Sequence, residues 1–200
     1  MKNQKSIFLK IVPLLCALGL LCACTAQTQN APTKTGVTSA VRVPQVIADE
    51  DYYKITETDG SFQYIVYDNS GNVLAHGVAT RPPEIGFISA SVLRFSLQTG
   101  TGRSTQWGFY YDTATDRKSQ TFQEVLDESG GKIAYGEKGG VAVQSIFDAA
   151  DRQVFSDFTP PLSTDPDAVR SAAFSQDGKQ LFVLYCAPDG GEHTQKFTVA

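Results

Sequence analysis

Histidine, methionine and tryptophan are scarce in this chain. Its 200 residues include 2 His, 1 Met and 1 Trp, which leaves little room for a histidine-rich metal site. No apolar run approaches the roughly 20 residues of a membrane-spanning helix, and helical periodicity is nearly absent. Basic residues are also few, since 17 Lys and Arg stand against 21 Asp and Glu. This balance argues against nucleic acid as a partner.

The N-terminus has the pattern of an export signal. Three lysines and no acidic residue occupy positions 1–10, and residues 11–23 form an apolar run of 13 residues. A positive start followed by a run of this length is typical of a secretory signal peptide. The run ends in Leu21-Cys22-Ala23-Cys24, which resembles the lipobox of bacterial lipoproteins. In that family a diacylglyceryl group is attached to the cysteine thiol, and the chain is cut just before it.

The resemblance implies a signal peptide over residues 1–23 and a lipidated, palmitate-type anchor on Cys24. Cys22 and Cys16 fit less well, because each follows a leucine where the motif has a small residue. A plain secretory signal and a short anchor helix are the alternatives. The two acyl chains of a diacylglyceryl group are enough for stable anchoring. The expected location is therefore extracytoplasmic, on the cell membrane.

The rest of the chain divides into a tether and one domain. Residues 24–45 contain no aromatic residue and are expected to be a flexible tether, followed by a single β-rich domain over residues 46–200. Beyond Cys24 the chain holds 14 basic and 21 acidic residues, so no polybasic patch assists the lipid. Cys186 is the one remaining cysteine, which excludes an internal disulfide. It lies in an apolar run and is expected to be buried and inert.

The domain is predicted to be all-β, with antiparallel hairpins or a meander and little helix. Short β-branched and aromatic runs alternate with Gly, Asp, Asn and Ser turns, and Asp59-Gly60 is a hairpin signal. The best helix candidate is residues 165–170, where Asp165 is a possible cap and Pro166 suits the first turn. The predicted strands are 52–58, 62–67, 73–79, 92–98, 107–111, 119–126, 132–135, 141–147, 153–158, 180–186 and 194–199.

A weak repeat suggests how these strands are grouped. Asp68, Asp112 and Asp148 each follow an aromatic-ended strand, at spacings of 44 and 36 residues. This resembles the outer hairpin of propeller blades, and the segment from Phe174 to Lys179 resembles an inner hairpin. The resemblance implies blades over 92–122, 132–158 and 172–199, with 52–79 pairing with the C-terminal strands. An irregular β-sandwich is the alternative. The three aspartates are interpreted as turn residues, not as metal ligands.

The surface singled out for ligand or partner binding is the connection rich in Gly and Thr at 100–105. A phosphate-binding loop would precede a helix, whereas a strand follows here, so we expect a hairpin tip. Its glycines expose backbone donors, and Arg and Trp are favoured anchors of binding sites. The candidate binding residues are Arg103, Trp107, Tyr110 and Arg94, although Trp107 and its aromatic neighbours are equally typical of a core.

No catalytic residue, cofactor or metal site is predicted. There is no G-x-S-x-G motif, His76 and His193 lack metal-ligand spacing, and Asp127 and Glu128 are interpreted as solvated turn carboxylates. Taken whole, the chain resembles small lipoproteins of Gram-positive bacteria, a resemblance that implies no particular activity. In a Gram-negative cell, Thr25 after the lipidated cysteine would be compatible with the outer membrane. We expect a non-catalytic module that binds a protein, peptide or envelope glycan; the alternative is an envelope hydrolase or protective factor.

Overall fold

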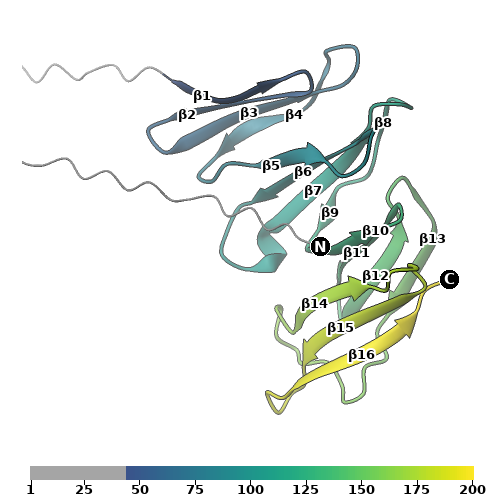
Figure 1. Cartoon of the computed structure of the whole chain (residues 1–200). Helices are drawn as coiled ribbons and strands as arrows, with labels where there is room; N and C mark the ends of the chain where they lie inside the picture. The colour runs from purple at the N-terminus through teal and green to yellow at the C-terminus, as the bar shows by residue number, and fades with distance from the viewer. Residues whose placement is uncertain (1–43) are drawn as a thin grey trace, which may run out of the picture. The chain divides into compact units, whose positions relative to one another are not determined.

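Residues 44–200 are described by the structure, a computed structural model (Figure 1). They form 16 strands and one short 3-10 helix, which confirms the all-β prediction. None of the helices in this range has the length and apolarity needed to cross a membrane. The predicted signal peptide, the lipobox with Cys24 and nearly all of the predicted tether lie outside the described residues.

The strands form four antiparallel sheets, named here A to D in chain order. Sheet A contains β1 (Gln45–Glu50), β2 (Tyr53–Thr58), β3 (Ser61–Tyr67) and β4 (Val73–Ala79). Sheet B contains β5 (Glu84–Phe87), β6 (Val92–Gln98), β7 (Gln106–Asp112), β8 (Arg117–Lys118) and β9 (Phe122–Gln123). Sheet C contains β10 (Val125–Ser129), β11 (Lys132–Glu137), β12 (Gly140–Ser145) and β13 (Asp148–Phe155). Sheet D contains β14 (Val169–Phe174), β15 (Gln180–Cys186) and β16 (Glu192–Thr198).

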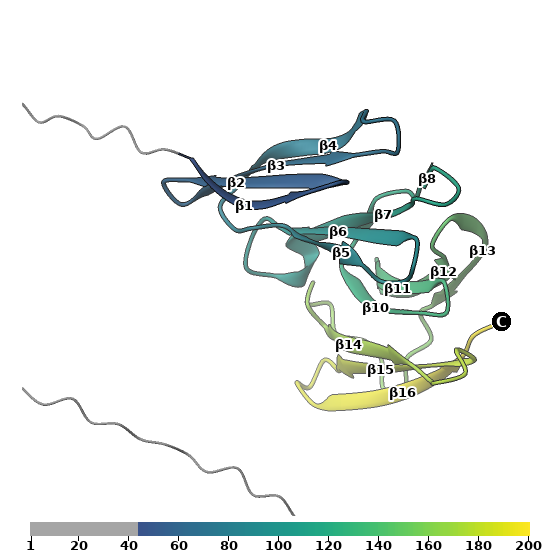
Figure 2. The same ribbon diagram turned by 45° about the horizontal axis from the view of Figure 1, so that its top comes forward.

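Successive sheets pack face to face, and each junction has its own hydrophobic core (Figure 2). Val66 of sheet A meets Phe95 of sheet B in the first core. Tyr110 of sheet B meets Ile133 of sheet C in the second, and Leu181 of sheet D packs against sheet C in the third. Because successive side chains of a strand point to opposite faces, the two inner sheets contribute to two cores each. This stacking is like that of propeller blades, but the first and last sheets share no strand pairing, so the array also fits the irregular β-sandwich that was the alternative prediction.

The predicted grouping of the strands is largely confirmed. Segments 92–122, 132–158 and 172–199 each supply strands to a single sheet. The pairing of 52–79 with the C-terminal strands was wrong, because this segment pairs with β1 in sheet A and the last three strands form sheet D. Joining neighbouring hairpins closes shorter loops and costs less chain entropy than joining the two ends of the domain.

The predicted helix at 165–170 was also wrong. The N–H of Ala168 donates to the carbonyl of Asp165 at 3.0 Å, and the Asp165 Oδ1 accepts from the N–H of Asp167 at 2.9 Å. These two bonds make a turn, after which Val169 begins β14. The same side-chain oxygen that caps a helix also closes an Asx turn, and the β-branched residue that follows favours a strand.

The turns built on aspartate are confirmed at Asp68 and Asp112, but the turn predicted after Asp148 was wrong, because the chain turns at residues 146–147 and Asp148 begins β13. Asp68 Oδ1 accepts from the backbone N–H groups of Ser70 and Asn72 at 2.9 and 2.8 Å. Asp112 and Asp148 each accept from the N–H two residues on, at 3.0 and 2.9 Å. Hydrogen bonds to these carboxylates lower the pKa of Asp68 and of Asp112. The three side chains are thus committed to their own backbone.

Candidate functional site

The candidate site lies on sheet B, where the register of β6 and β7 sorts the predicted residues onto two faces. Arg94 is paired with Tyr110 across the two strands, and both face sheet C. Trp107 is three positions before Tyr110 and therefore points to the other face. There its ring lies 5.3 Å from that of Phe95, in the core shared with sheet A. The structure thus brings Arg94 and Tyr110 together and separates Trp107 from them.

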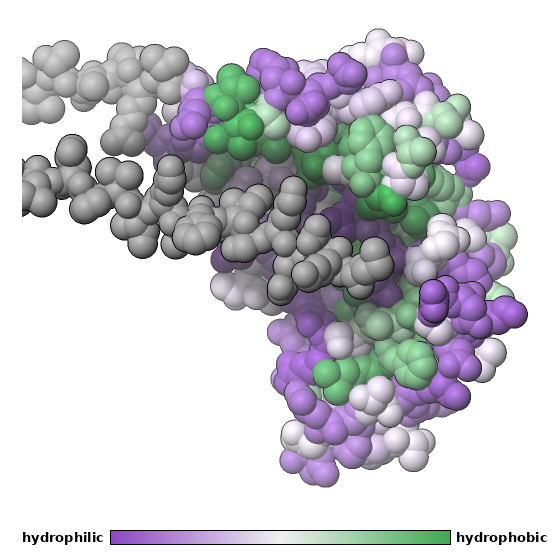
Figure 3. Space-filling model, in the orientation of Figure 1, coloured by the Kyte–Doolittle hydropathy of each residue, from purple (hydrophilic) through white to green (hydrophobic). Residues whose placement is uncertain are grey.

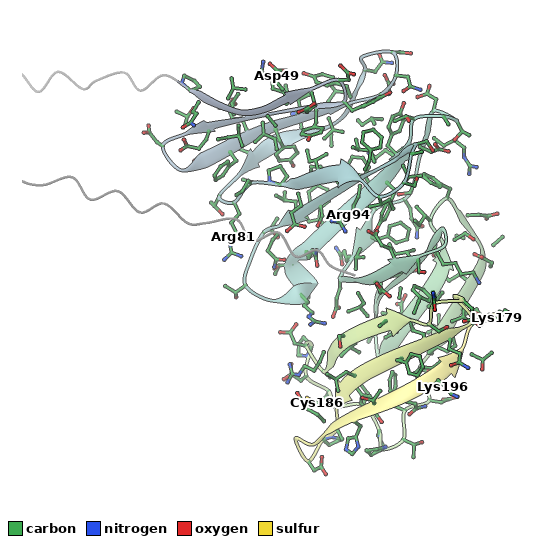
Figure 4. The ribbon with its side chains drawn as sticks, in the orientation of Figure 1. Asp49, Arg81, Arg94, Lys179, Cys186 and Lys196 are labelled. Atoms are coloured by element: carbon green, nitrogen blue, oxygen red, sulfur yellow. The ribbon has the colours of Figure 1, made fainter. Side chains whose placement is uncertain are left out.

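Arg94 and Tyr110 are joined by a residue that the sequence had not indicated. Glu128 of β10 accepts from the Arg94 guanidinium at 2.9 Å and from the Tyr110 hydroxyl at 2.5 Å. Tyr110 is 1% exposed, and the Glu128 side chain is 19% exposed. Burial and the Glu128 carboxylate both raise the pKa of Tyr110, so its hydroxyl remains a proton donor. Figure 4 labels Arg94 between the ribbons of sheets B and C.

The interpretation of Asp127 and Glu128 as solvated turn carboxylates was therefore wrong. Both lie in β10, and Asp127 Oδ2 accepts from the backbone N–H of Phe174 in sheet D at 2.7 Å. One carboxylate bonds to sheet B and the next to sheet D. Because consecutive side chains of a strand point to opposite faces, these two carboxylates join sheet C to sheet B on one face and to sheet D on the other.

Beside this network are two adjoining pockets that share Ser96 and Gln106. The first, of about 220 Å³, is lined by Arg94, Tyr110 and residues 125–128 of β10. The second, of about 510 Å³, lies between the segment before β5 and the β6–β7 connection; we call it the hairpin pocket. Figure 3 shows the hydrophobic side chains of the face in view in separate patches among hydrophilic ones.

The β6–β7 connection is a hairpin tip as predicted, and it contains a 3-10 turn, Arg103–Thr105, that the sequence analysis missed. The Gln98 side chain holds the tip, because the two N–H groups of its Nε2 are shared among three acceptors: the carbonyls of Gly100 and Gly102 at 2.9 and 2.8 Å and the Thr105 hydroxyl at 2.7 Å. A Cβ on Gly100 would lie 2.8 Å from the Thr105 methyl group. The tip is therefore tightly built, and it carries Arg103 on its exposed side.

Glu124, between β9 and β10, was also missed. It adopts a left-handed backbone conformation, with φ of 51°, and interrupts what was predicted as one strand over 119–126. Burial first, and then the neighbouring Asp167, raise the pKa of its carboxyl, while Arg103 opposes the shift. Among the described residues, no hydrogen-bond partner reaches Asp167 Oδ1, which is buried. Within residues 44–200 no three His, Cys, Asp or Glu side chains gather in a way that would hold a metal ion.

The two histidines lie apart from this region and from each other. His76 is on β4, exposed, while His193 is on β16 with its ring 5.8 Å from that of Tyr185. Neither is hydrogen bonded to a serine or a carboxylate within the described chain. Cys186 is buried as expected, and the Arg170 Nε donates to its sulfur at 3.1 Å. The geometry thus offers a polar binding surface on sheet B.

No family model matches the chain, and no curated protein matches it. The solved structures that match it include two Hsv2 proteins, each over most of the chain. Hsv2 of Kluyvelomyces marxianus has a TM-score of 0.36 and 10% identity, over 74% of this chain and 46% of that one. Hsv2 of Kluyveromyces lactis has a TM-score of 0.28 and 10% identity, over 76% and 72%. The chain thus spans less than half of the first of these proteins.

Proposed function

We propose that the protein is an extracytoplasmic lipoprotein, anchored to the cell membrane through Cys24, whose β-domain is a non-catalytic binding module. Its ligand is a glycan, protein or peptide of the cell envelope. The lipobox-like Leu21-Cys22-Ala23-Cys24 supports the anchor. The observation that carries the binding role is the pair of adjoining polar pockets on sheet B, beside a hairpin tip fixed by Gln98.

A preformed polar surface is suited to binding because few side chains must be ordered when the ligand arrives. Gln106 Nε2 donates to the Ser96 hydroxyl at 3.1 Å, so the wall shared by the two pockets is also fixed. The competing function is an envelope hydrolase. Two histidines in separate sheets, without a hydrogen-bonded serine or carboxylate among the described residues, do not favour it.

The anchor is tested by metabolic labelling with an alkynyl fatty acid in a bacterial host. The wild-type chain and a Cys22→Ser control are expected to take up the label and stay with the membrane. Cys24→Ser is expected to lose the label, because the thiol that carries the lipid is gone. Labelling that persists in Cys24→Ser would remove the basis for the anchor.

The binding role is tested by co-sedimentation of the purified full chain with isolated cell walls. The wild type is expected to sediment with the walls, and Arg103→Ala to remain more in solution, while Lys196→Ala on sheet D serves as the control for loss of one exposed cation. The supernatant is assayed for released sugar or peptide fragments. Release that is abolished by His76→Ala or His193→Ala would favour the hydrolase instead.

A further inference from the structure

The arginines of the described chain divide into two groups. Residues 44–200 contain six arginines, and four of them donate to an acceptor on another residue. The acceptors are Glu128 for Arg94, the Phe147 carbonyl for Arg117, Tyr135 and Glu137 for Arg152, and the Asp167 carbonyl and Cys186 for Arg170. The guanidinium groups of Arg81 and Arg103 have no hydrogen bond or ion pair with any residue in this range. Both line the hairpin pocket.

The unpaired state of Arg81 and Arg103 is not due to a shortage of carboxylates. Residues 44–200 hold 12 Lys and Arg against 21 Asp and Glu, so a cation placed at random would meet acidic neighbours. Glu84 supplies the carboxylate among the residues that line the hairpin pocket. Its side chain is 75% exposed and forms its ion pair with Arg94, at 3.9 Å. Glu124 influences Arg103 through space but makes no ion pair with it. Two arginines thus line one pocket, and no carboxylate of residues 44–200 forms an ion pair with either.

The two arginines come from separate segments of sheet B. Arg81 precedes β5 in a segment stiffened by Pro82, whereas Arg103 begins the 3-10 turn of the β6–β7 connection. Figure 4 labels Arg81 beside the start of sheet B. A carboxylate matches a single guanidinium fork, whereas a phosphate offers oxygens to donors on more than one side. The Ser96 and Thr101 hydroxyl groups of the same pocket are further donors.

We propose that the hairpin pocket binds a phosphate group carried on a small hydroxylated molecule, as in a sugar phosphate. A pocket of about 510 Å³ lies within the range of small-molecule sites and holds more than a phosphate ion. Arg81 and Arg103 bind the phosphate oxygens, and the polar wall of Ser96 and Gln106 faces the sugar. This proposal rests on the proposed function, because it specifies the ligand of the same surface as a phosphorylated envelope glycan.

The test is isothermal titration calorimetry of the full chain in a neutral detergent at low salt. The probes are glucose 6-phosphate, glucose, glucuronate and inorganic phosphate. We expect glucose 6-phosphate to bind more tightly than inorganic phosphate or glucuronate, and glucose not to bind. Arg81→Gln and Arg103→Gln should each weaken glucose 6-phosphate binding about tenfold, and added salt should weaken it further. Lys196→Gln is the control, because Lys196 is also exposed and unpaired within the described residues but lies on sheet D.

Absence of glucose 6-phosphate binding, or binding that both arginine variants leave unchanged, would overturn the proposal. If inorganic phosphate binds as tightly as glucose 6-phosphate, the proposal that the pocket recognises the sugar is wrong. If glucuronate binds as tightly, the proposal that the pocket selects a phosphate over a carboxylate is wrong. Both arginines are exposed, and the emission of Trp107 checks that each variant is folded. If a double variant that combines Arg81→Gln with Arg103→Gln still sediments with cell walls, the phosphate site is wrong and the binding module stands. If the wild type binds neither walls nor sugar phosphates, both proposals fail.

Discussion

Replacement of Tyr110 by phenylalanine is the sharpest test of how sheets B and C are joined. The substitution removes one hydroxyl group and leaves the ring, which is 1% exposed and packed against Phe122. What is lost is a hydrogen bond of 2.5 Å to the Glu128 carboxylate. A hydrogen bond to a charged group contributes about 1.5–3 kcal/mol to stability. Glu128 keeps its bond to Arg94, so no buried charge is orphaned, and we expect a loss of about 2 kcal/mol.

The assay is equilibrium unfolding in urea, followed by the emission of Trp107, the one tryptophan of the chain. A loss of this size should lower the midpoint without changing the slope, since the folded and unfolded surfaces are the same. Tyr64→Phe is the matched control. Tyr64 is 5% exposed and its hydroxyl makes no hydrogen bond within the described chain, so its removal should cost less than about 0.5 kcal/mol.

Two results would refute the reasoning behind the Tyr110 prediction. One is a loss below about 0.5 kcal/mol for Tyr110→Phe, which is the size of an ordinary neutral change. The other is an equal loss in Tyr64→Phe, which would assign the effect to the ring environment and not to Glu128. A double-mutant cycle with Glu128→Gln separates the pairwise contribution, because the two side chains are in direct contact.

Two further predictions concern backbone packing and pH. Gly108→Ala should destabilise the domain by about 1–3 kcal/mol, because the added Cβ would lie 2.3 Å from the Phe95 carbonyl oxygen. Gly86→Ala in the same sheet is the control, since its Cβ would meet nothing within 4 Å. Thermal unfolding of both variants checks this prediction, and equal losses of stability would contradict it. Glu124→Gln should raise the melting temperature at pH 7 but not near pH 4. The pKa of Glu124 is raised from 4.5 in the folded protein, so the folded state binds more protons and its stability falls as the pH rises through that raised pKa. Melting curves against pH in both proteins test the sign, and a destabilised variant at pH 7 would contradict it.

The sequence predicted the strands well wherever alternation and turn chemistry agreed. Asp59 and Gly60 both adopt positive φ values, 53° and 76°, as a tight hairpin of this twist requires. The alternation of side chains along β7 also predicts that Trp107 and Tyr110 point to opposite faces of the sheet, because the two residues are three positions apart on one strand. Trp107 was grouped with Tyr110 and Arg94 because arginine and aromatic residues near the hairpin tip are favoured binding anchors, and that grouping did not take account of the alternation that separates Trp107 from the other two.

What the sequence did not reveal were partners chosen by the packing of whole sheets. Glu128 is 34 residues from Arg94, and no local pattern links the two. Residues 45–50 lack aromatic side chains and are mostly exposed, so their place in sheet A depends on backbone pairing with β2. Propensity carries little information for such an edge strand. At 165–170 the sequence did contain a capping residue, Asp165, but an aspartate side chain that can cap a helix can equally close a turn.

The stacking of the sheets also explains why the proposed site lies on a connection and not on a strand. Sheets B and C are covered on both faces, so a polar group between them must be satisfied within the protein. Arg94, Glu128 and Tyr110 meet that requirement with one another, which leaves little free hydrogen-bonding capacity for a ligand. Arg103 lies at the open end of the same sheet, on a hairpin tip with its backbone held by Gln98. The guanidinium of Arg103 is bonded to nothing in the described chain, so it is free to meet a ligand, while the hairpin backbone that carries it is held in place.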